Sequence, residues 1–375
     1  MPRITTFMRE EHSVSYRTFP YADLRRFCLK TYSNYGFSSQ ESEIITDTLL
    51  CADLFGIESH GVQRMNRYHN EISKGLVKID AKPVIILETH ISAVLDADKS
   101  MGQVVSARAM DLAIKKAKTA GIGMITVRNS NHHGISGYFA NMACKEDLMG
   151  VCMTNAESMA VPTFGKEAMC GTNPIALAFP ADPVDFLFDA STTVVTMGKV
   201  EVYKKNEELL PENWAVRTNG HISRDAVDVL RNIAGKLGGG ILPLGGLGEN
   251  FGGHKGYGLG IIVDLFTGIL SSGKTSNHVN RVEGQNDISH FFMAVDYGLF
   301  GDKSDIQNHF SSFLHELRNS RKADGQERIY THGEKEVESR ERKLVDGIPL
   351  SIKTVGEMQV IAESLGININ NYLTL

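Results

Sequence analysis

Apolar residues recur at intervals of three and four over the first part of the chain, from about residue 21 to residue 75. This spacing places them on one face of a helix and predicts several amphipathic helices. Ser39, followed by two glutamates, marks the start of the second of these helices. We expect a third helix to begin after Ser59 and to end at Gly75.

The middle of the chain alternates short apolar runs of strand length with helical segments. Strands are expected at residues 84–88, 92–95, 124–127, 150–154, 175–179, 186–189 and 291–295, and helices at 102–119 and 256–270. The last sixty or so residues return to charged helix and loop, with a final helix near 355–365. This layout predicts a mixed α/β protein in which helical ends pack around an α/β middle.

Composition narrows the class of protein but not its chemistry. The 375 residues carry a formal net charge of −5, which argues against nucleic acid as a partner because phosphate binding needs a basic surplus. Five cysteines without a CxxC pair are expected to be reduced core thiols, as in a cytoplasmic protein. The polar N-terminus does not resemble a signal peptide, and the longest apolar run, 259–270, is too short to span a bilayer. We expect no membrane association and no metal site.

The segment 59–68 carries the first candidate chemistry. If Ser59 caps a helix, then His60, Arg64 and Tyr68 fall at successive intervals of four and share one face. An arginine can hold a carboxylate through two hydrogen bonds, and an imidazole in the first helical turn is kept neutral and can accept a proton. The alternative is an exposed helix face with a capped start.

A second polar segment, Asn129 to Gly134, directly follows a predicted buried strand and precedes a predicted helix at 135–145. Reactive groups of α/β enzymes are often placed in such loops. Either His132 or His133 could be a general base. The alternative is a polar turn whose histidines are merely solvated.

Two further segments could bind a cofactor. Asp189 follows a predicted strand and could orient a histidine or bind a ribose hydroxyl, while Ser191 and Thr192 are expected to open the next helix, where N–H groups bind phosphate. Lys255 lies in the glycine-rich stretch 252–260, beside the start of a helix. The helix dipole disfavours a cation there unless an anion is bound, so a phosphate or carboxylate is plausible nearby. The alternatives are simple capping residues and a flexible loop.

Residues 268–275 match the GxxxxGK[ST] pattern of phosphate-binding loops. Such a loop follows a strand and precedes a helix, whereas here a helical segment precedes the match and a polar loop follows it. We expect a chance match, with a nucleotide triphosphate-binding protein as a remote alternative. The chain also lacks a strand–GxGxxG–helix unit followed by an acidic residue roughly 20 positions on, so motif rules alone leave the cofactor unassigned.

Taken together, these segments resemble the type-2 malate/L-lactate dehydrogenase family, which also includes ureidoglycolate, sulfolactate, diketogulonate and cyclic imino acid enzymes. The resemblance runs from about residue 19 to residue 366. It rests on SHGVQRMNRY (59–68), NSNHHGISGYFA (129–140), TNAESMAVPTFG (154–165), CGTNPIALAFP (170–180), DASTTVVTMGK (189–199), LPENWAV (210–216), GGHKGYGLGIIVDLF (252–266) and HFFMAVD (290–296).

The resemblance implies a mixed α/β fold that is not of the Rossmann type, with helical N- and C-terminal parts packed together. It implies a helical substrate-side segment at 1–85, a nicotinamide-cofactor domain at 86–303 and a C-terminal helical segment at 304–375 that joins the N-terminal part. It also implies a homodimer with its active site at a domain and subunit interface. The cofactor is expected to be NAD, with NADP possible.

Roles are carried over residue by residue. The resemblance implies that His132 is the proton acceptor, that Ser59 and His60 lie near the substrate, that Arg64 binds its carboxylate with Tyr68 nearby, and that Asp189 can take part in a charge relay. The implied cofactor contacts are Asn155, Ala156, Ala190, Ser191, Thr192 and Lys255. Three departures stand out: an apparent insertion at 246–252, His133 where relatives often have an aromatic residue, and Ala156 where many have a hydroxyl.

The expected activity is interconversion of a small 2-hydroxy acid and its 2-oxo acid, with malate favoured and lactate as a close relative. A reductase of another 2-oxo or cyclic imino acid, of the ureidoglycolate, diketogulonate or sulfolactate type, is the alternative. In either case the substrate brings a carboxylate next to the reacting carbon, and a histidine moves the hydroxyl proton while a hydride leaves C2.

Overall fold

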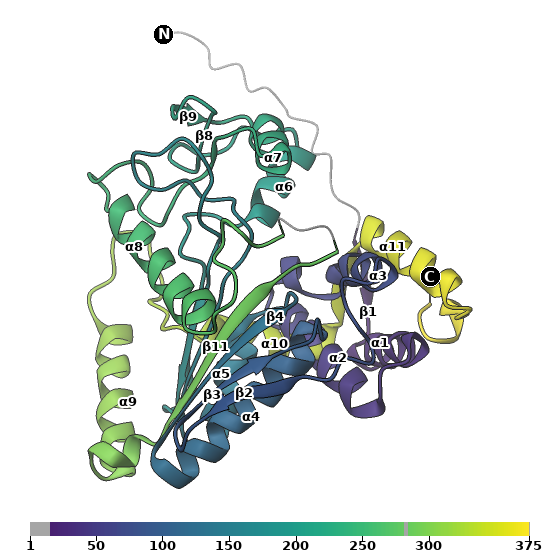
Figure 1. Ribbon diagram of the computed structural model, residues 1–375. Coiled ribbons are helices and arrows are strands. Elements are labelled where there is room, and N and C mark those ends of the chain that lie inside the picture. Colours follow the sequence, from purple (N-terminus) through teal and green to yellow (C-terminus); the bar gives the residue numbers. More distant parts are fainter. Residues whose placement is uncertain (1–15, 281–283, 375) are drawn as a thin grey trace.

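A computed structural model describes residues 16–280 and 284–374. Residues 1–15, most of the polar N-terminus that does not resemble a signal peptide, lie outside the described residues. The model has a large twisted sheet, a helical lobe on one side of it and a smaller region above it (Figure 1). No helix in the described part of the chain is long and apolar enough to cross a membrane.

A seven-stranded mixed sheet forms the centre, in the order β2-β3-β4-β11-β5-β6-β7. Its strands are β2 (Val84–Glu88), β3 (Ser92–Asp96), β4 (Ile122–Ser130), β5 (Met149–Thr154), β6 (Ile175–Phe179), β7 (Phe186–Ala190) and β11 (Ile288–Val295). Only β3 and β4 run parallel, and the other neighbours are antiparallel. This pattern confirms the prediction of a mixed, non-Rossmann sheet, because a Rossmann sheet is mostly parallel.

Two helices, α4 (Gly102–Ala120) and α5 (Ser136–Cys144), pack against this sheet and share an apolar core with it. Glycines in the strands permit the close approach. A Cβ on Gly123 would lie 2.0 Å from the carbonyl oxygen of Ala113, and one on Gly150 would lie 2.1 Å from that of Ala140. The central strand β11 is buried along almost its whole length, and it places His290 beneath the loop that follows β4.

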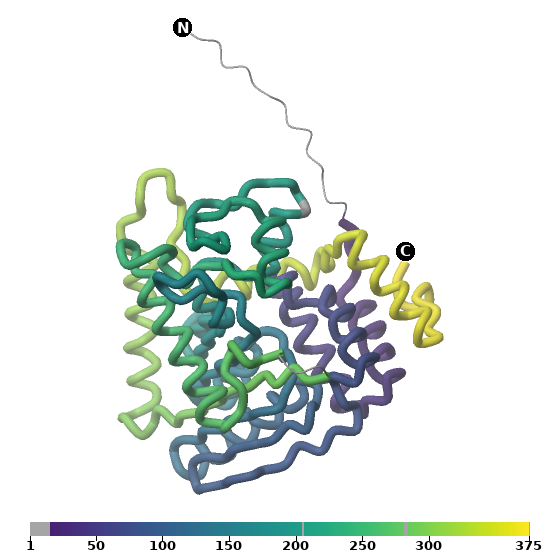
Figure 2. The backbone as a smooth tube through the Cα atoms, turned by 45° about the horizontal axis from the view of Figure 1, so that its top comes forward, coloured from purple at the N-terminus to yellow at the C-terminus, as the bar shows by residue number. Residues whose placement is uncertain are grey.

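The helical lobe is built from both ends of the chain, which lie side by side in Figures 1 and 2. It contains β1 (Tyr16–Phe19), α1 (Tyr21–Tyr35), α2 (Ser39–Leu54), α3 (Met65–Ser73), α10 (Glu334–Asp346), β12 (Ile348–Ser351) and α11 (Ile352–Ser364). Strands β1 and β12 pair antiparallel, and side chains from both ends form one apolar core. Helical N- and C-terminal parts therefore do pack together, as expected.

The smaller region carries α6 (Met197–Lys205), α7 (Ala226–Gly235) and a three-stranded sheet, and it has an apolar core of its own. The sheet consists of β8 (Ala215–Val216), β9 (Ile222–Ser223) and β10 (Gly240–Ile241). Helix α8 (Gly253–Asp264) follows and continues as a π-helical turn, Leu265–Ile269. Helix α9 (Lys303–Asn319) lies away from the helical lobe, where its Phe310 contacts Phe179 and Phe186 of the large sheet. The division of the chain at residues 85 and 303 stays a prediction.

Two predicted helix starts are wrong. The helix expected from Ser59 begins only at Met65, after two short 3-10 turns, η1 (Glu58–His60) and η2 (Val62–Arg64), because Gly61 between them has an extended backbone. Ser191 and Thr192 do not open a helix either, since α6 begins at Met197. The backbone N–H of Thr192 donates to Thr172 and its carbonyl accepts from Leu244, which keeps this segment extended.

Candidate active site

The turn that carries His60 and Arg64 is held by a buried carboxylate. Asp53, near the end of α2, accepts a hydrogen bond from the backbone N–H of Val62 at 2.8 Å. Burial raises the pKa of Asp53 to about 7, although this hydrogen bond and the nearby Lys343 act in the opposite direction. The carboxylate occupies the space next to Gly61 in which any side chain would lie, so the turn requires glycine.

His132 lies at the meeting point of α3 and the loop after β4. The hydroxyl of Tyr68 is 2.8 Å from Nδ1 of His132, and the ring of His60 stacks on that of His132 with centroids 5.5 Å apart. Burial lowers the pKa of His132 well below its ordinary value, and the positive charges of Arg67 and Arg64 lower it further. The imidazole is therefore neutral near pH 7 and can accept a proton.

His60 is neutral as well, and its ring contacts Ser59. Its Nδ1 is 2.8 Å from the hydroxyl oxygen of Ser59. Burial, assisted by the charges of Arg64 and Arg67, lowers the pKa of His60 to about 3. Ser59 also accepts a hydrogen bond from Nε of Arg64 through its backbone carbonyl, so the Ser59–His60 pair fixes both an imidazole and a guanidinium.

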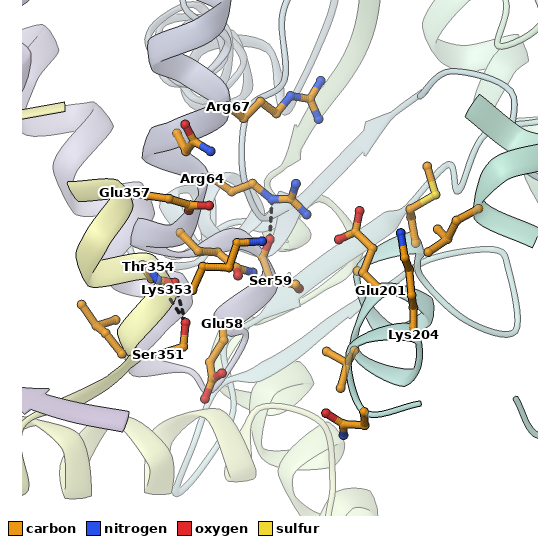
Figure 3. Close-up of a pocket in the computed structure, with 18 of the residues that line it drawn as sticks. Glu58, Ser59, Arg64, Arg67, Glu201, Lys204, Ser351, Lys353, Thr354 and Glu357 are labelled. Carbon is orange, nitrogen blue, oxygen red and sulfur yellow. Dashed lines mark hydrogen bonds between the residues drawn. The ribbon is translucent and has the colours of Figure 1, made fainter. Parts of the chain in front are cut away.

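A cleft of about 2070 Å³ opens beside these groups, between the helical lobe and α6. Its walls include Ser59, Arg64, Arg67, Gly198 and Glu201. Figure 3 shows the guanidinium groups of Arg64 and Arg67 extending from the same side of the cleft toward the wall formed by α6. The cleft thus offers two cationic groups, and the hydroxyl of Ser59 in its wall contacts the neutral imidazole of His60.

Sequence reasoning missed Arg67. His60, Arg64 and Tyr68 are four residues apart, whereas Arg67 lies three positions after Arg64. Because residues three apart also share a helix face, the interval of three was the signal that could have found it.

His133, the other histidine proposed as a base, belongs to the core. Its two ring nitrogens lie 3.1 Å from the hydroxyls of Ser106 and Ser136, and its ring stacks on His290 with centroids 4.5 Å apart. Only 1% of His133 is exposed. Of the two neighbouring histidines, only His132 retains an accessible surface.

Asn155 and Ala156 hold several loops together. The amide of Asn155 donates to the carbonyl of Lys274 at 2.7 Å and to Asp264 at 3.2 Å, and the N–H of Ala156 donates to Asn173 at 3.1 Å. The carbonyl of Lys274 is therefore engaged within the fold. The GxxxxGK[ST] match runs from a π-helical turn into further turns, which is not the strand–loop–helix context of a phosphate-binding loop.

Asp189, at the end of β7, accepts a hydrogen bond from the N–H of Gly137 at 2.6 Å, in the first turn of α5. Burial raises its pKa to about 6, partly offset by that bond. Among the hydrogen bonds of the described residues, Asp189 has none with a histidine, so the expected charge relay is not formed in this structure.

The other proposed cofactor residues lie on β7, on the extended segment after it and on α8. Ala190 ends β7, the Ser191 hydroxyl donates to the carbonyl of Thr193, and Thr192 is buried against Thr172. Lys255 is exposed in the first turn of α8.

Fold and site together define a mixed α/β enzyme in which a pair of stacked, neutral histidines lies beside a cleft lined by two arginines. The chain belongs to the malate/L-lactate dehydrogenase family, whose model matches residues 19–359.

Known proteins of this family are similar to the chain over nearly its whole length. It is 44% identical to a malate dehydrogenase of Pyrococcus abyssi over 94% of this chain and 96% of that protein. It is 32% identical to an L-sulfolactate dehydrogenase of Methanocaldococcus jannaschii, over 93% and 97%. Among solved structures, malate dehydrogenase from Entamoeba histolytica matches with a TM-score of 0.91 at 34% identity, over 94% of this chain and 99% of that one.

Proposed function

We propose that this enzyme oxidises a small 2-hydroxy acid to its 2-oxo acid with a nicotinamide cofactor, and that malate, converted to oxaloacetate, is its main substrate. The observation that carries this proposal is that His60 stacks on His132 and Tyr68 lies at hydrogen-bond distance from it, beside the cleft that Arg64 lines. Similarity to malate dehydrogenases favours malate. Similarity to sulfolactate and ureidoglycolate dehydrogenases supports another 2-hydroxy acid as the alternative.

The residues divide the work of the reaction. Arg64 uses its Nε to hold the carbonyl of Ser59, and its remaining N–H groups face the cleft and bind the carboxylate next to the reacting carbon. His132 takes the hydroxyl proton, while the hydroxyl of Tyr68 and the backbone N–H of Gly134, 2.8 Å and 3.4 Å from its Nδ1, hold the ring in place. Burial raises the pKa of Tyr68, so its phenol stays protonated and serves to orient the ring.

The cofactor proposal depends on α8 and the segment after β7. The first turn of α8 follows Gly252, whose backbone is left-handed, and it exposes Lys255 beside free N–H groups of the helix start, a donor set that fits a pyrophosphate. Asn155, Ala156, Ala190, Ser191 and Thr192 would line the rest of the site. When bound, the oxidised nicotinamide accepts the hydride from C2. We propose NAD, with NADP as the alternative.

The assembly and location are also proposed. Exposed apolar side chains gather on two elements, and such surfaces often mark an interface between subunits. They are Leu259, Ile261, Ile262 and Leu265 in and after α8, and Val84, Ile85, Ile86 and Leu87 in β2. They support a homodimer. The free state of all five cysteines supports a reducing, cytoplasmic location.

A substrate panel tests this proposal. The purified enzyme is incubated with malate, lactate, sulfolactate or ureidoglycolate and either NAD or NADP, and the reduced cofactor is followed by its absorbance. We expect malate with NAD to give the highest kcat/KM. Absence of turnover with every 2-hydroxy acid would overturn the proposal, whereas preference for sulfolactate or ureidoglycolate would keep the reaction class and replace the substrate.

A further inference from the structure

Arg67 is a second guanidinium at the cleft. Its Nε pairs with Oε1 of Glu71 at 2.8 Å, one turn further along α3, just as Nε of Arg64 is tied to the carbonyl of Ser59. In both residues Nε is held by a neighbouring group. The two terminal nitrogens of each guanidinium, with four N–H bonds, face the cleft (Figure 3). Each side chain therefore presents one guanidinium group to the cleft, and both groups lie on the same side of it.

The charge of Arg67 reaches the reacting histidine. Among the charges that lower the pKa of His132, Arg67 has the largest effect, ahead of His60 and Arg64. Arg67 also lowers the pKa of Arg64, which shows that the two cations repel each other. An anionic ligand that contacts both would relieve this repulsion and return the pKa of His132 toward its ordinary value.

The donors of the two guanidinium groups, rather than their net charge, favour a ligand with two anionic groups, because Glu71 already compensates one of the two charges. Arg67 has Glu71 as a partner, but among the ion pairs of the described residues none involves Arg64. Residues three apart on a helix have Cβ atoms roughly 5–6 Å apart, a spacing that long arginine side chains can adjust to the two ends of a four-carbon diacid. A monocarboxylate would engage only one of the two guanidinium groups.

We propose that Arg67 binds the second anionic group of the substrate, so that the site selects 2-hydroxy acids with a carboxylate or sulfonate at the far end over lactate. This inference rests on the proposed 2-hydroxy acid dehydrogenase function. The simpler account, in which Arg67 only stabilises α3 through Glu71, uses one side of the guanidinium and gives no reason for a side chain that is 34% exposed at the cleft.

The test compares malate, sulfolactate and lactate as substrates of the wild type and of Arg67→Met. Loss of a charge-assisted contact is expected to reduce kcat/KM for malate and sulfolactate by about 10- to 100-fold, while kcat/KM for lactate stays within about threefold. Equal losses on all three substrates, or no loss on any, would overturn the proposal. Selective loss for only one of the two dianions identifies the natural second group as a carboxylate or a sulfonate.

Two further variants serve as controls, one for folding and one for the loss of a cation elsewhere in the cleft. Because Arg67→Met leaves the carboxylate of Glu71 buried without its partner, the double variant Arg67→Met with Glu71→Leu removes both members of the ion pair and should fold with the same loss of selectivity. Lys204→Met removes a cation of α6 from the opposite wall of the cleft (Figure 3) and should leave the malate-to-lactate ratio unchanged.

Binding gives a readout that does not depend on turnover. Succinate and butyrate have four carbons and lack the reacting hydroxyl, and their affinities are measured by calorimetry. We expect wild-type enzyme to prefer succinate and the double variant to lose that preference; equal affinities in the wild type would refute the role of Arg67. An enzyme active on lactate but not on either dianion would refute this role alone, whereas inactivity on all three would also remove the proposed function.

Discussion

The carboxylate of Asp53 lies against Gly61: a Cβ built on Gly61 would be 1.9 Å from Oδ1 of Asp53. The same carboxylate accepts the N–H of Val62, so it fixes the bend between the turn that carries His60 and the turn that carries Arg64. The positions of two proposed site residues therefore depend on the close contact between this glycine and this acid.

Gly61→Ala should lower both stability and activity. The added methyl group forces the turn away from Asp53, and overpacking of this kind costs about 1–3 kcal/mol. Thermal unfolding should show a lower Tm, and kcat/KM for malate should fall because Arg64 is displaced. Gly356→Ala is the matched control: nothing lies within 4 Å of its added Cβ, and alanine should stabilise α11 by about 0.5–1 kcal/mol. An unchanged Tm in Gly61→Ala would contradict the crowding seen here.

His132→Ala should reduce kcat by roughly 10²–10⁴-fold, the usual contribution of a general base. Affinity for NAD, measured by fluorescence quenching or calorimetry, should change little, because the proposed cofactor contacts lie elsewhere. His221→Ala changes an exposed histidine on the smaller region and serves as the control. Full activity of the His132 variant would show that another group takes the proton.

Tyr68→Phe keeps the ring and removes the hydroxyl that lies 2.8 Å from Nδ1 of His132. A neutral hydrogen bond contributes about 0.5–1.5 kcal/mol, so we expect a loss in kcat of roughly 3- to 10-fold with KM nearly unchanged. Because Tyr68 is buried, circular dichroism and the Tm should be recorded alongside the kinetics. A loss confined to KM would argue that the phenol binds substrate instead of orienting His132.

Acid should destabilise the protein through His290. Its ring nitrogens lie 2.8 Å from the Thr154 hydroxyl and 2.9 Å from the Ser130 hydroxyl, and burial lowers its pKa to about 3. The unfolded chain has a histidine pKa near 6.5 and binds the proton first, so the stabilising effect is complete above about pH 6.5 and is lost as pH falls toward 3. By pH 5 this amounts to about 2 kcal/mol, from 1.36 kcal/mol per pH unit.

His290→Gln should therefore lose less stability between pH 7 and pH 5 than the wild type, by about 2 kcal/mol, in denaturant titrations at each pH. The comparison uses the change in the free energy of unfolding between the two pH values, so a uniform loss of stability in the variant does not affect the result. His221→Gln, at an exposed position, should keep the wild-type slope. Identical slopes for His290→Gln and the wild type would rule out a proton-linked role for this histidine.

The sequence predicted the strands of the large sheet well, since buried runs such as 175–179 carry a clear pattern and appear at β6 with the same bounds. It did not predict the break at Gly61, because that break comes from Asp53, a residue eight positions earlier, through a tertiary hydrogen bond. It also could not choose between His132 and His133. Neighbouring residues in a loop face different ways according to backbone angles that only the folded loop sets.

Pairing of β1 with β12 has a consequence for biosynthesis. The lobe that carries His60 and Arg64 shares its core with β12 and α11, which are translated after all strands of the large sheet. The nascent chain can form the large sheet early, but the helical lobe keeps an open apolar face until β12 and α11 have been translated. Chains that stop short of residue 348 would consequently expose this face. We expect chaperones to bind such chains and proteases to degrade them, so that no partly active enzyme accumulates.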